Sequence, residues 1–460
     1  MRIFTKLTTI LSLVRFKATS FVKSLFKTRN VLVVVSLFLV IGSGFLLYKS
    51  LTPKRILTQS EFVAQSKSLP VENKPAIRKV FLNSTPDLSF SMAEINNLSR
   101  FLYGTYTAPP AKYSVKKYKV KYTSLDQSNK EITIYAQFYI PGVEMAQSFP
   151  VYIFGQGTTG LGDTCAPSKE QPRYDNWGDY QTHMLSYASQ GYIVMFPDYE
   201  GFNDPGRIHH YFNAQLEAHV LLDGAKATFE LLNSDPTLLV KPKDAVFFAG
   251  YSQGGHAVFA VSDVAASYAP EVPIKGVIGD GPTTDIAALL RENPILSPYL
   301  IYSYSDLYGK DQIDPAQILL PSLLENLALN VKSLCIGKIS NAYSSNPRKI
   351  FNDKFYSALF NNTLEQDFPE INKLFNENNS GLLKSSVPGL VLQGTADPIV
   401  TVKSQKEFVR KSCAVGNSIT YYEYPSVHHY RIRQASIKDT LNWMDRIIEG
   451  KIPVSSCAGL

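Results

Sequence analysis

A serine flanked by glycines stands between a short apolar run and a segment suited to a helix. The run is Val246-Phe-Phe-Ala249, and Gly250-Tyr-Ser252-Gln-Gly254 follows it directly. A G-x-S-x-G turn of this kind lifts one serine hydroxyl clear of a sheet, where it can act as a nucleophile. The spacing alone is weak evidence, because an ordinary glycine-rich turn also fits it. The strand expected before it and the helix expected after it favour a catalytic Ser252.

A carboxylate that could orient a base lies further along the chain. A nucleophilic serine needs a base, and the base needs such a carboxylate. The apolar segment Gly389-Leu-Val-Leu-Gln-Gly394 runs into a turn that carries Asp397, followed by Pro398. The position after a buried strand predicts that Asp397 is the orienting acid. An ordinary turn aspartate, which caps a helix or closes an Asx-turn, is the alternative.

Two adjacent histidines, His428 and His429, complete the order serine, acid, histidine that α/β-hydrolases share. From position alone either could be the base, and the other is then a surface loop residue. His256 follows the serine by four residues and is expected to pack near the turn. No group of histidines has the spacing of a metal site on a helix face, so we expect neither a catalytic metal nor a cofactor.

A second glycine-rich loop, Gly155-Gln-Gly-Thr-Thr-Gly160, follows the apolar segment at residues 150–154. A carbonyl attacked by the serine develops negative charge, which two preorganised backbone N–H groups can stabilise. One donor of this oxyanion hole is expected from Gln253, the residue after the nucleophile. The other is expected from the loop, with Thr158 as first choice and Thr159 as second. A simple glycine-rich turn is the alternative.

Short apolar segments alternate with amphipathic ones, which predicts an α/β fold with a mainly parallel, doubly wound sheet. Strands are expected at residues 150–154, 192–196, 245–249, 274–278, 389–393 and 419–424. Helices are expected at 91–102, 179–190, 214–233, 255–266, 404–411 and 437–448. Residues 114–122 and 131–139 are typical of an antiparallel hairpin. The stretch between residues 278 and 389 is too long for a connection, so we expect a cap insertion at about 283–385.

An uncharged apolar stretch of 18 residues lies near the N-terminus, at residues 31–48. A helix of that length spans about 27 Å, enough to cross a thin bilayer. Seven Lys and Arg residues precede it and three follow closely, which predicts a cytoplasmic N-terminus and an extracytoplasmic body. The long basic region and the lack of an A-x-A-like site favour an uncleaved signal anchor. A cleaved signal peptide, which would leave the protein secreted, is the alternative.

The positive charge of the chain is concentrated at its beginning. Residues 1–55 carry ten Lys and Arg and no acidic residue, whereas the rest carries 36 Lys and Arg against 39 Asp and Glu. The body is nearly neutral, so the net charge of +7 does not indicate binding to nucleic acid. We expect a basic cytoplasmic tail at residues 1–30, a transmembrane anchor at 31–48, a stalk and lead-in at 49–105 and a catalytic domain at 106–460. The stalk itself is expected to extend to about residue 88.

Four cysteines, Cys165, Cys335, Cys413 and Cys457, are an even number in a domain expected outside the cytoplasm. Two disulfides are therefore expected, and the sequence allows three pairings. No two of these cysteines have C-x-x-C spacing, which argues against a zinc site or a thioredoxin-like site.

From residue 106 to residue 451 the chain resembles the secretory lipase family of α/β-hydrolases, known from fungi and bacteria. Gln156-Gly-Thr-Thr-Gly160 and Cys165-Ala-Pro-Ser168 resemble the family's H-G-T-T-G and C-A-P-S motifs, with Gln156 in place of the usual histidine. Pro197-Asp-Tyr-Glu-Gly201 resembles its P-D-Y-x-G turn. The segments 250–255 and 394–397 resemble its nucleophile and acid turns.

The resemblance implies which histidine is the base. The family's histidine is followed six or seven residues later by Ala-Ser and after fourteen by Trp. Ala435, Ser436 and Trp443 stand at these distances from His429 and not from His428. The resemblance therefore implies that His429 is the base. It also implies two disulfides, Cys165–Cys335 and Cys413–Cys457.

We expect a carboxylic ester hydrolase that acts on an ester or lipid through Ser252, His429 and Asp397 and an acyl-enzyme intermediate. Three alternatives remain: a serine peptidase of the prolyl-oligopeptidase type, a cell-surface acyltransferase and a non-catalytic surface-binding protein. The peptidase usually carries a propeller, for which this chain has no room. The expected architecture is an α/β-hydrolase fold with a helical cap, preceded by one transmembrane helix that joins it to the membrane.

Overall fold

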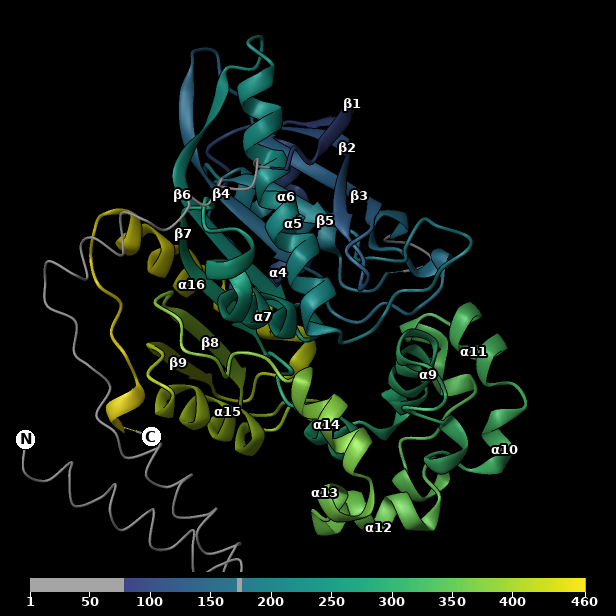
Figure 1. Cartoon of the computed structure of the whole chain (residues 1–460). Helices are drawn as coiled ribbons and strands as arrows, with labels where there is room; N and C mark the ends of the chain where they lie inside the picture. The colour runs from purple at the N-terminus through teal and green to yellow at the C-terminus, as the bar shows by residue number, and fades with distance from the viewer. Residues whose placement is uncertain (1–77, 172–175, 460) are drawn as a thin grey trace, which may run out of the picture. The chain divides into compact units, whose positions relative to one another are not determined.

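One nine-stranded sheet forms the centre of the described chain, which in this computed structural model comprises residues 78–171 and 176–459. The strand order is β1-β2-β3-β5-β4-β6-β7-β8-β9 (Figure 1). The strands are β1 (Phe81–Phe90), β2 (Val115–Leu125), β3 (Glu131–Pro141), β4 (Gln147–Gly155), β5 (Ile193–Pro197), β6 (Val240–Tyr251), β7 (Ile274–Asp280), β8 (Gly389–Gly394) and β9 (Ile419–Tyr424). The pairs from β1 to β5 are antiparallel, and those from β5 to β9 are parallel. The prediction of a mainly parallel sheet is therefore confirmed.

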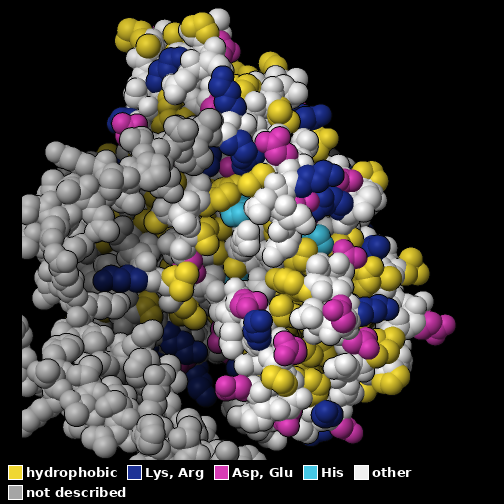
Figure 2. All heavy atoms as spheres, viewed as in Figure 1, with side chains coloured by type: hydrophobic (Ala, Val, Ile, Leu, Met, Phe, Trp, Pro, Cys, Tyr) yellow, Lys and Arg dark blue, Asp and Glu magenta, His cyan; other side chains and the backbone are white. Residues whose placement is uncertain are grey.

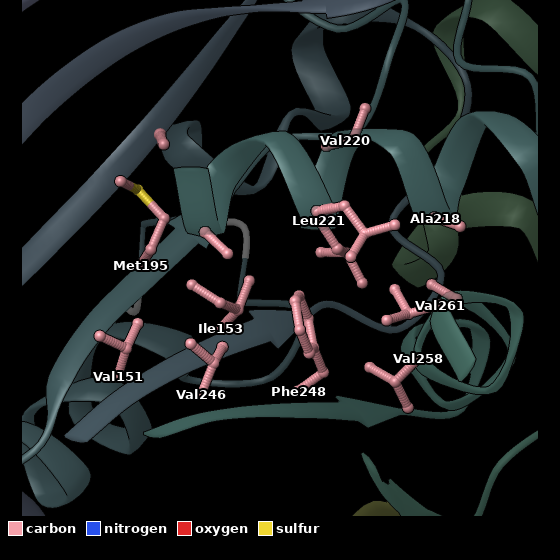
Figure 3. Packing of buried hydrophobic residues seen from close by; sticks show 14 of the residues in the cluster. Val151, Ile153, Met195, Ala218, Val220, Leu221, Val246, Phe248, Val258 and Val261 are labelled. Carbon is pink, nitrogen blue, oxygen red and sulfur yellow. The ribbon is translucent and has the colours of Figure 1, made fainter. Parts of the chain in front are cut away.

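The central strands are apolar on both faces because helices cover both. On β6, Val246 and Phe248 belong to one core cluster, whereas Phe247 and Ala249 belong to the other. This division follows from the two-residue period of a strand. Figure 3 shows the first cluster, in which strand side chains lie against those of the covering helices, with labelled members Val151, Ile153, Met195, Leu221, Val258 and Val261 among them.

Helices from different parts of the chain cover the two faces. The helices α6 (Ala214–Ser234), α7 (Gln253–Tyr268) and α15 (Val402–Ala414) contribute to the first cluster. The helices α4 (Met92–Tyr103), α5 (Tyr180–Ala188) and α16 (Ile432–Ile448) contribute to the second. All six correspond to helices expected from the sequence, although α16 begins five residues earlier than expected.

Between β7 and β8 the chain forms a group of helices with an apolar core of its own, drawn in green in Figure 1. They are α8 (Ile286–Glu292), α9 (Ser297–Tyr308), α10 (Pro321–Leu324), α11 (Leu327–Ser333), α12 (Asp353–Asn361), α13 (Leu364–Asp367) and α14 (Pro369–Glu377). We call residues 286–377 the cap. Tyr211 and Phe212, which precede α6, pack into this core and so join the cap to the sheet domain.

The expected stalk at residues 49–88 is wrong for its last part. Residues 81–90 form the edge strand β1, which pairs antiparallel with β2 from Phe81 beside Tyr122 to Phe90 beside Val115. An edge strand pairs on one side only, so it can accommodate Pro86. Most side chains of β1 are exposed, so its sequence lacks the alternation of apolar and polar residues by which a strand is recognised. The compact unit accordingly begins at Arg78 rather than near residue 106.

The expected basic tail, membrane anchor and first part of the stalk lie outside the described residues. Within residues 78–171 and 176–459, no helix is long and apolar enough to span a bilayer. Figure 2 shows acidic and basic side chains interspersed over the coloured part of one face. This distribution agrees with the nearly neutral charge balance of the body.

Candidate active site

Ser252 stands between β6 and α7 with φ 55° and ψ −111°. A residue other than glycine adopts such a conformation only where the surrounding structure enforces it. The backbone around the turn is packed so closely that two flanking positions have room only for glycine. A Cβ on Gly250 would lie 2.0 Å from the carbonyl oxygen of Gly254, and one on Gly254 would lie 1.9 Å from that of Gly155. The sharp turn expected from the motif is therefore present, with Ser252 at the N-terminus of α7.

Asp397 and His429 form a buried pair. Nδ1 of His429 lies 2.7 Å from Oδ2 of Asp397. Oδ1 of Asp397 accepts hydrogen bonds from the N–H groups of Ile399 and Val400, at 2.8 and 2.9 Å. The side chain of Asp397 has no exposed surface, and that of His429 is 3% exposed. Both follow the carboxyl ends of neighbouring parallel strands, β8 and β9, which brings residues 32 positions apart together.

The two adjacent histidines occupy different environments. His428 is exposed, whereas His429 is buried. Nε2 of His429 is buried and has no hydrogen-bond partner within the described residues. A neutral imidazole that donates from Nδ1 to a carboxylate keeps a lone pair on Nε2, which can accept a proton. Only His429 therefore has the surroundings of a general base.

The end of β7 and the segment that follows it lie beside Ser252, His429 and Asp397. The N–H of Ser252 donates to the carbonyl oxygen of Asp280 at 3.0 Å, and the N–H of Thr283 donates to that of Ser252 at 3.2 Å. At Gly281, where φ is 55°, a Cβ would lie 3.1 Å from Nδ1 of His429 and 3.4 Å from Oδ2 of Asp397. Sequence reasoning missed this segment, although Gly279-Asp-Gly-Pro282, at the end of a buried strand, is a recognisable turn signal.

The glycine-rich loop after β4 lies against the serine turn, because Gly155 pairs with Gly250 in the sheet. Two tyrosines hold the loop: the N–H of Gly157 donates to the hydroxyl of Tyr180 at 2.9 Å, and Oγ1 of Thr158 lies 2.6 Å from the hydroxyl of Tyr211.

The cap also holds this loop, since the N–H of Ile336 donates to the carbonyl oxygen of Thr159 at 2.8 Å. Gln253 is the first residue of α7, so its N–H has no partner within the helix. The two expected oxyanion donors, Gln253 and Thr158, thus lie on adjoining segments.

Gln156, which replaces the family's usual histidine, is buried, and both polar atoms of its side chain lack partners in the described part of the chain. Its carbonyl oxygen accepts a hydrogen bond from the hydroxyl of Tyr199, at 3.3 Å. The substitution therefore leaves the backbone of the loop anchored.

A second buried carboxyl group, Asp280, lies beside the serine turn. Burial raises its pKa to about 6, although a hydrogen bond from Ser436 and the charge of Arg433 act in the opposite direction. Asp280 accepts from Oγ of Ser436 at 2.7 Å. It is Asp397 and not Asp280 that is hydrogen-bonded to His429.

Two disulfides, Cys165–Cys335 and Cys413–Cys457, join the pairs implied by the resemblance, with Cα atoms 5.4 and 5.5 Å apart. The first joins the segment after the glycine-rich loop to the cap, and the second joins α15 to the C-terminal segment. Both pairings are confirmed. Within the described residues no group of three or more His, Cys, Asp or Glu side chains is arranged to hold a metal ion.

Comparison with known proteins adds independent evidence. The family model described as secretory lipase matches residues 179–456, more than half of the chain. A secreted triacylglycerol lipase of Malassezia furfur is 23% identical over 274 residues, which cover 58% of this chain and 50% of that protein. The chain thus spans about half the length of that relative. Lipase A of Moesziomyces aphidis is 23% identical over 375 residues, 74% of each chain.

Solved structures show the same fold. The rice cell wall degrading esterase LipA of Xanthomonas oryzae superposes with a TM-score of 0.66 at 18% identity, covering 82% of this chain and all of the other. Candida antarctica lipase A superposes with a TM-score of 0.62 at 19% identity, covering 82% and 83%. The α/β-hydrolase architecture is therefore confirmed. By the family match, this chain belongs to the secretory lipase family.

Proposed function

We propose that the protein hydrolyses carboxylic esters through a triad of Ser252, His429 and Asp397 and an acyl-enzyme intermediate. The observation that carries the proposal is the buried Asp397–His429 pair with an unpartnered Nε2, next to the segment that holds the strained turn of Ser252. The substrates proposed are esters of acyl chains, as the names of the lipase and esterase relatives suggest.

The first half of the reaction forms the acyl-enzyme. Nε2 of His429 takes the hydroxyl proton of Ser252 as Oγ bonds to the ester carbonyl carbon. Asp397 stabilises the imidazolium that results. The N–H groups of Gln253 and Thr158 bind the oxyanion. Collapse of the tetrahedral intermediate breaks the bond to the alkoxide, which receives the proton from His429 and leaves as an alcohol.

The second half returns the enzyme to its starting state. His429 takes a proton from water, the resulting hydroxide attacks the acyl carbon, and Ser252 leaves with the proton held by His429. One ester and one water thus give one alcohol and one carboxylic acid. The pair Asp397–His429 performs the same proton transfer in each half.

The central test removes the nucleophile. Ser252→Ala is expected to lower kcat on short p-nitrophenyl esters by about 10³-fold or more. Ser262→Ala is the matched control, because Ser262 is a buried residue of the same helix whose hydroxyl donates to the carbonyl oxygen of Phe259. Undiminished activity of Ser252→Ala would refute the proposal.

Two further measurements separate the alternatives. A fluorophosphonate probe is expected to label wild type but not Ser252→Ala, whereas a non-catalytic binding protein would not react. Product analysis with an added alcohol is expected to give mainly the free acid. A predominance of the transferred ester would instead indicate an acyltransferase with the same intermediate.

We also propose that the catalytic domain works outside the cytoplasm. Two disulfides are typical of proteins from oxidising compartments. Membrane attachment through residues 31–48 remains a prediction from the sequence. Fractionation of cells that produce the full chain, followed by non-reducing electrophoresis, tests both points: the proposal fails if the protein is cytosolic and its cysteines are reduced.

A further inference from the structure

Four buried side chains lie behind the serine turn, each at most 2% exposed: His209, Glu217, Gln253 and His256. Nε2 of Gln253 lies 2.7 Å from Oε1 of Glu217 and 2.6 Å from Nε2 of His209. Oε2 of Glu217 lies 2.6 Å from Nδ1 of His256. Glu217 of α6 thus contacts two residues in the first turn of α7, the turn that begins directly after Ser252.

The acceptors around Gln253 determine which atoms of this group donate hydrogen bonds and which accept them. Nδ1 of His209 lies 3.1 Å from the carbonyl oxygen of Glu200, which can only accept, so Nδ1 donates. Nε2 of a neutral His209 is then an acceptor for the amide of Gln253, and burial lowers the pKa of His209 in agreement with a neutral ring. Both amide hydrogens of Gln253 are therefore bound, one by His209 and one by Glu217.

The carboxylate of Glu217 is itself held in place. Its Oε1 also accepts from the N–H of Phe212 at 3.1 Å. Nε2 of His256 donates to the carbonyl oxygen of Asn378, at 2.6 Å. A second hydrogen bond joins Nδ1 of His256 to Oε2 of Glu217. Glu217 is thereby linked to Asn378, the residue that directly follows α14 of the cap.

We propose that Glu217 is a positioning residue, which fixes the peptide of Gln253 so that its N–H faces the oxyanion. The inference rests on the proposed function, in which that N–H is an oxyanion donor. The buried side chain of Gln253 is held by hydrogen bonds to two other segments, so a displacement of its Cα would strain or break them. Oxyanion donors act over a narrow range of distances, and small displacements therefore cost rate rather than substrate binding.

The experiment compares three variants, Glu217→Leu, Gln253→Met and Glu217→Gln, on a short p-nitrophenyl ester. The first two are expected to lower kcat by about tenfold to a hundredfold and to leave KM within about twofold. The inhibition constant of a trifluoromethyl ketone, which forms a reversible tetrahedral adduct with a serine, is expected to rise in parallel with the loss of kcat.

Glu217→Gln is expected to keep kcat within about threefold of wild type. Its amide oxygen can still accept from Gln253 and Phe212, while its NH₂ group donates to a neutral His256. Gln253→Met leaves the contact between Glu217 and His256 intact, so it tests the inference even if Glu217→Leu does not fold.

Asp223→Leu is the matched control. Asp223 lies six residues further along α6, has no exposed surface and accepts from Arg78, Ser124 and Tyr268 at 2.5, 2.9 and 2.7 Å. Its replacement is expected to lower the melting temperature without changing kcat per folded molecule. Unchanged kcat in Gln253→Met would overturn the inference whatever Glu217→Leu shows, and so would a kcat loss in Asp223→Leu equal to that in Glu217→Leu.

Failure of the proposed function gives a different result. If Ser252→Ala retains esterase activity, the triad proposal and this inference fail together. If Ser252→Ala is inactive while the Glu217 and Gln253 variants keep wild-type kcat, only the positioning role fails.

Discussion

The carboxylate of Asp397 faces His429 with one oxygen and the backbone with the other. Oδ2 lies 2.7 Å from Nδ1 of His429, while Oδ1 accepts the N–H groups of Ile399 and Val400. The hydrogen of a neutral imidazole is therefore held on Nδ1, which leaves Nε2 with its lone pair. This is the tautomer that a general base for Ser252 requires.

The Asp397→Asn variant tests the importance of that tautomer. The two backbone N–H groups would hold the amide oxygen, so the NH₂ group would face Nδ1 of His429 and drive the ring hydrogen to Nε2. We expect kcat to fall by about 10³- to 10⁴-fold with the melting temperature little changed. Asp439→Asn, at an exposed residue that accepts from the hydroxyl of Tyr424, is the control. A loss below tenfold for Asp397→Asn would contradict the assignment.

The adjacent histidines allow a matched comparison. His429→Gln removes the proposed base and is expected to lower kcat by about 10³-fold or more. His428→Gln changes an exposed side chain one position away and is expected to keep kcat within about twofold. Steady-state kinetics on one p-nitrophenyl ester suffice. The opposite ranking of the two variants would show that His428 is the base.

His210 connects the sheet domain to the cap through charge. Nδ1 lies 2.9 Å from Oε2 of Glu200, and Nε2 lies 3.3 Å from Oδ2 of Asp306 on α9. Burial acts to lower the pKa of His210, but hydrogen bonds to Asp306 and Glu200 outweigh it and raise the pKa to about 9. The ring is therefore charged at neutral pH and attracts both carboxylates.

This raised pKa predicts a pH-dependent stability difference. Because the folded pKa exceeds the unfolded value, the stabilisation is fully present below about pH 6.5 and is lost as the pH rises through about 9. His210→Gln is expected to lower the free energy of unfolding by about 3 kcal/mol at pH 6 and by much less at pH 10. Urea unfolding of both proteins across this range measures the effect. A difference that does not shrink with rising pH would contradict it.

The two disulfides are expected to contribute unequally to stability. Cys165–Cys335 closes a loop of 170 residues, whereas Cys413–Cys457 closes one of 44. The chain-entropy model predicts that loss of the first costs about 1 kcal/mol more than loss of the second. Urea unfolding of the two double Cys→Ser variants measures the difference. An equal or smaller loss for the Cys165–Cys335 pair would show that loop length does not determine the effect.

Local patterns in the sequence were enough to predict most of the sheet. The run from Val246 to Ala249 is apolar because both faces of β6 are covered, and the glycines after it fit only a tight turn. Residues 81–90 could not be recognised in this way. An edge strand with exposed side chains and a proline has no apolar period, and its pairing with β2 depends on a segment more than 20 residues away.

The candidate site was only partly predictable for a similar reason. Ser252 and Asp397 follow strands that the sequence reveals, so their places at the sheet edge could be inferred. Glu217 lies in the middle of the chain with no motif around it, and its contact with Gln253 exists only because α6 packs beside α7.

By itself, the sequence determined the order of the strands and helices from β2 onward outside the cap, together with the serine turn and the acid turn, because turn chemistry and apolar period are properties of neighbouring residues. It left His428 and His429 open from position alone and allowed three cysteine pairings, and resemblance to a family was needed to choose among them. Tertiary structure decided what depends on distant packing: the burial of His429 against Asp397, the two disulfides, and the side chains of α6 that hold Gln253. Such contacts join residues far apart in the chain, so they arise only when the strands align at one edge of the sheet and the helices and the cap pack against it.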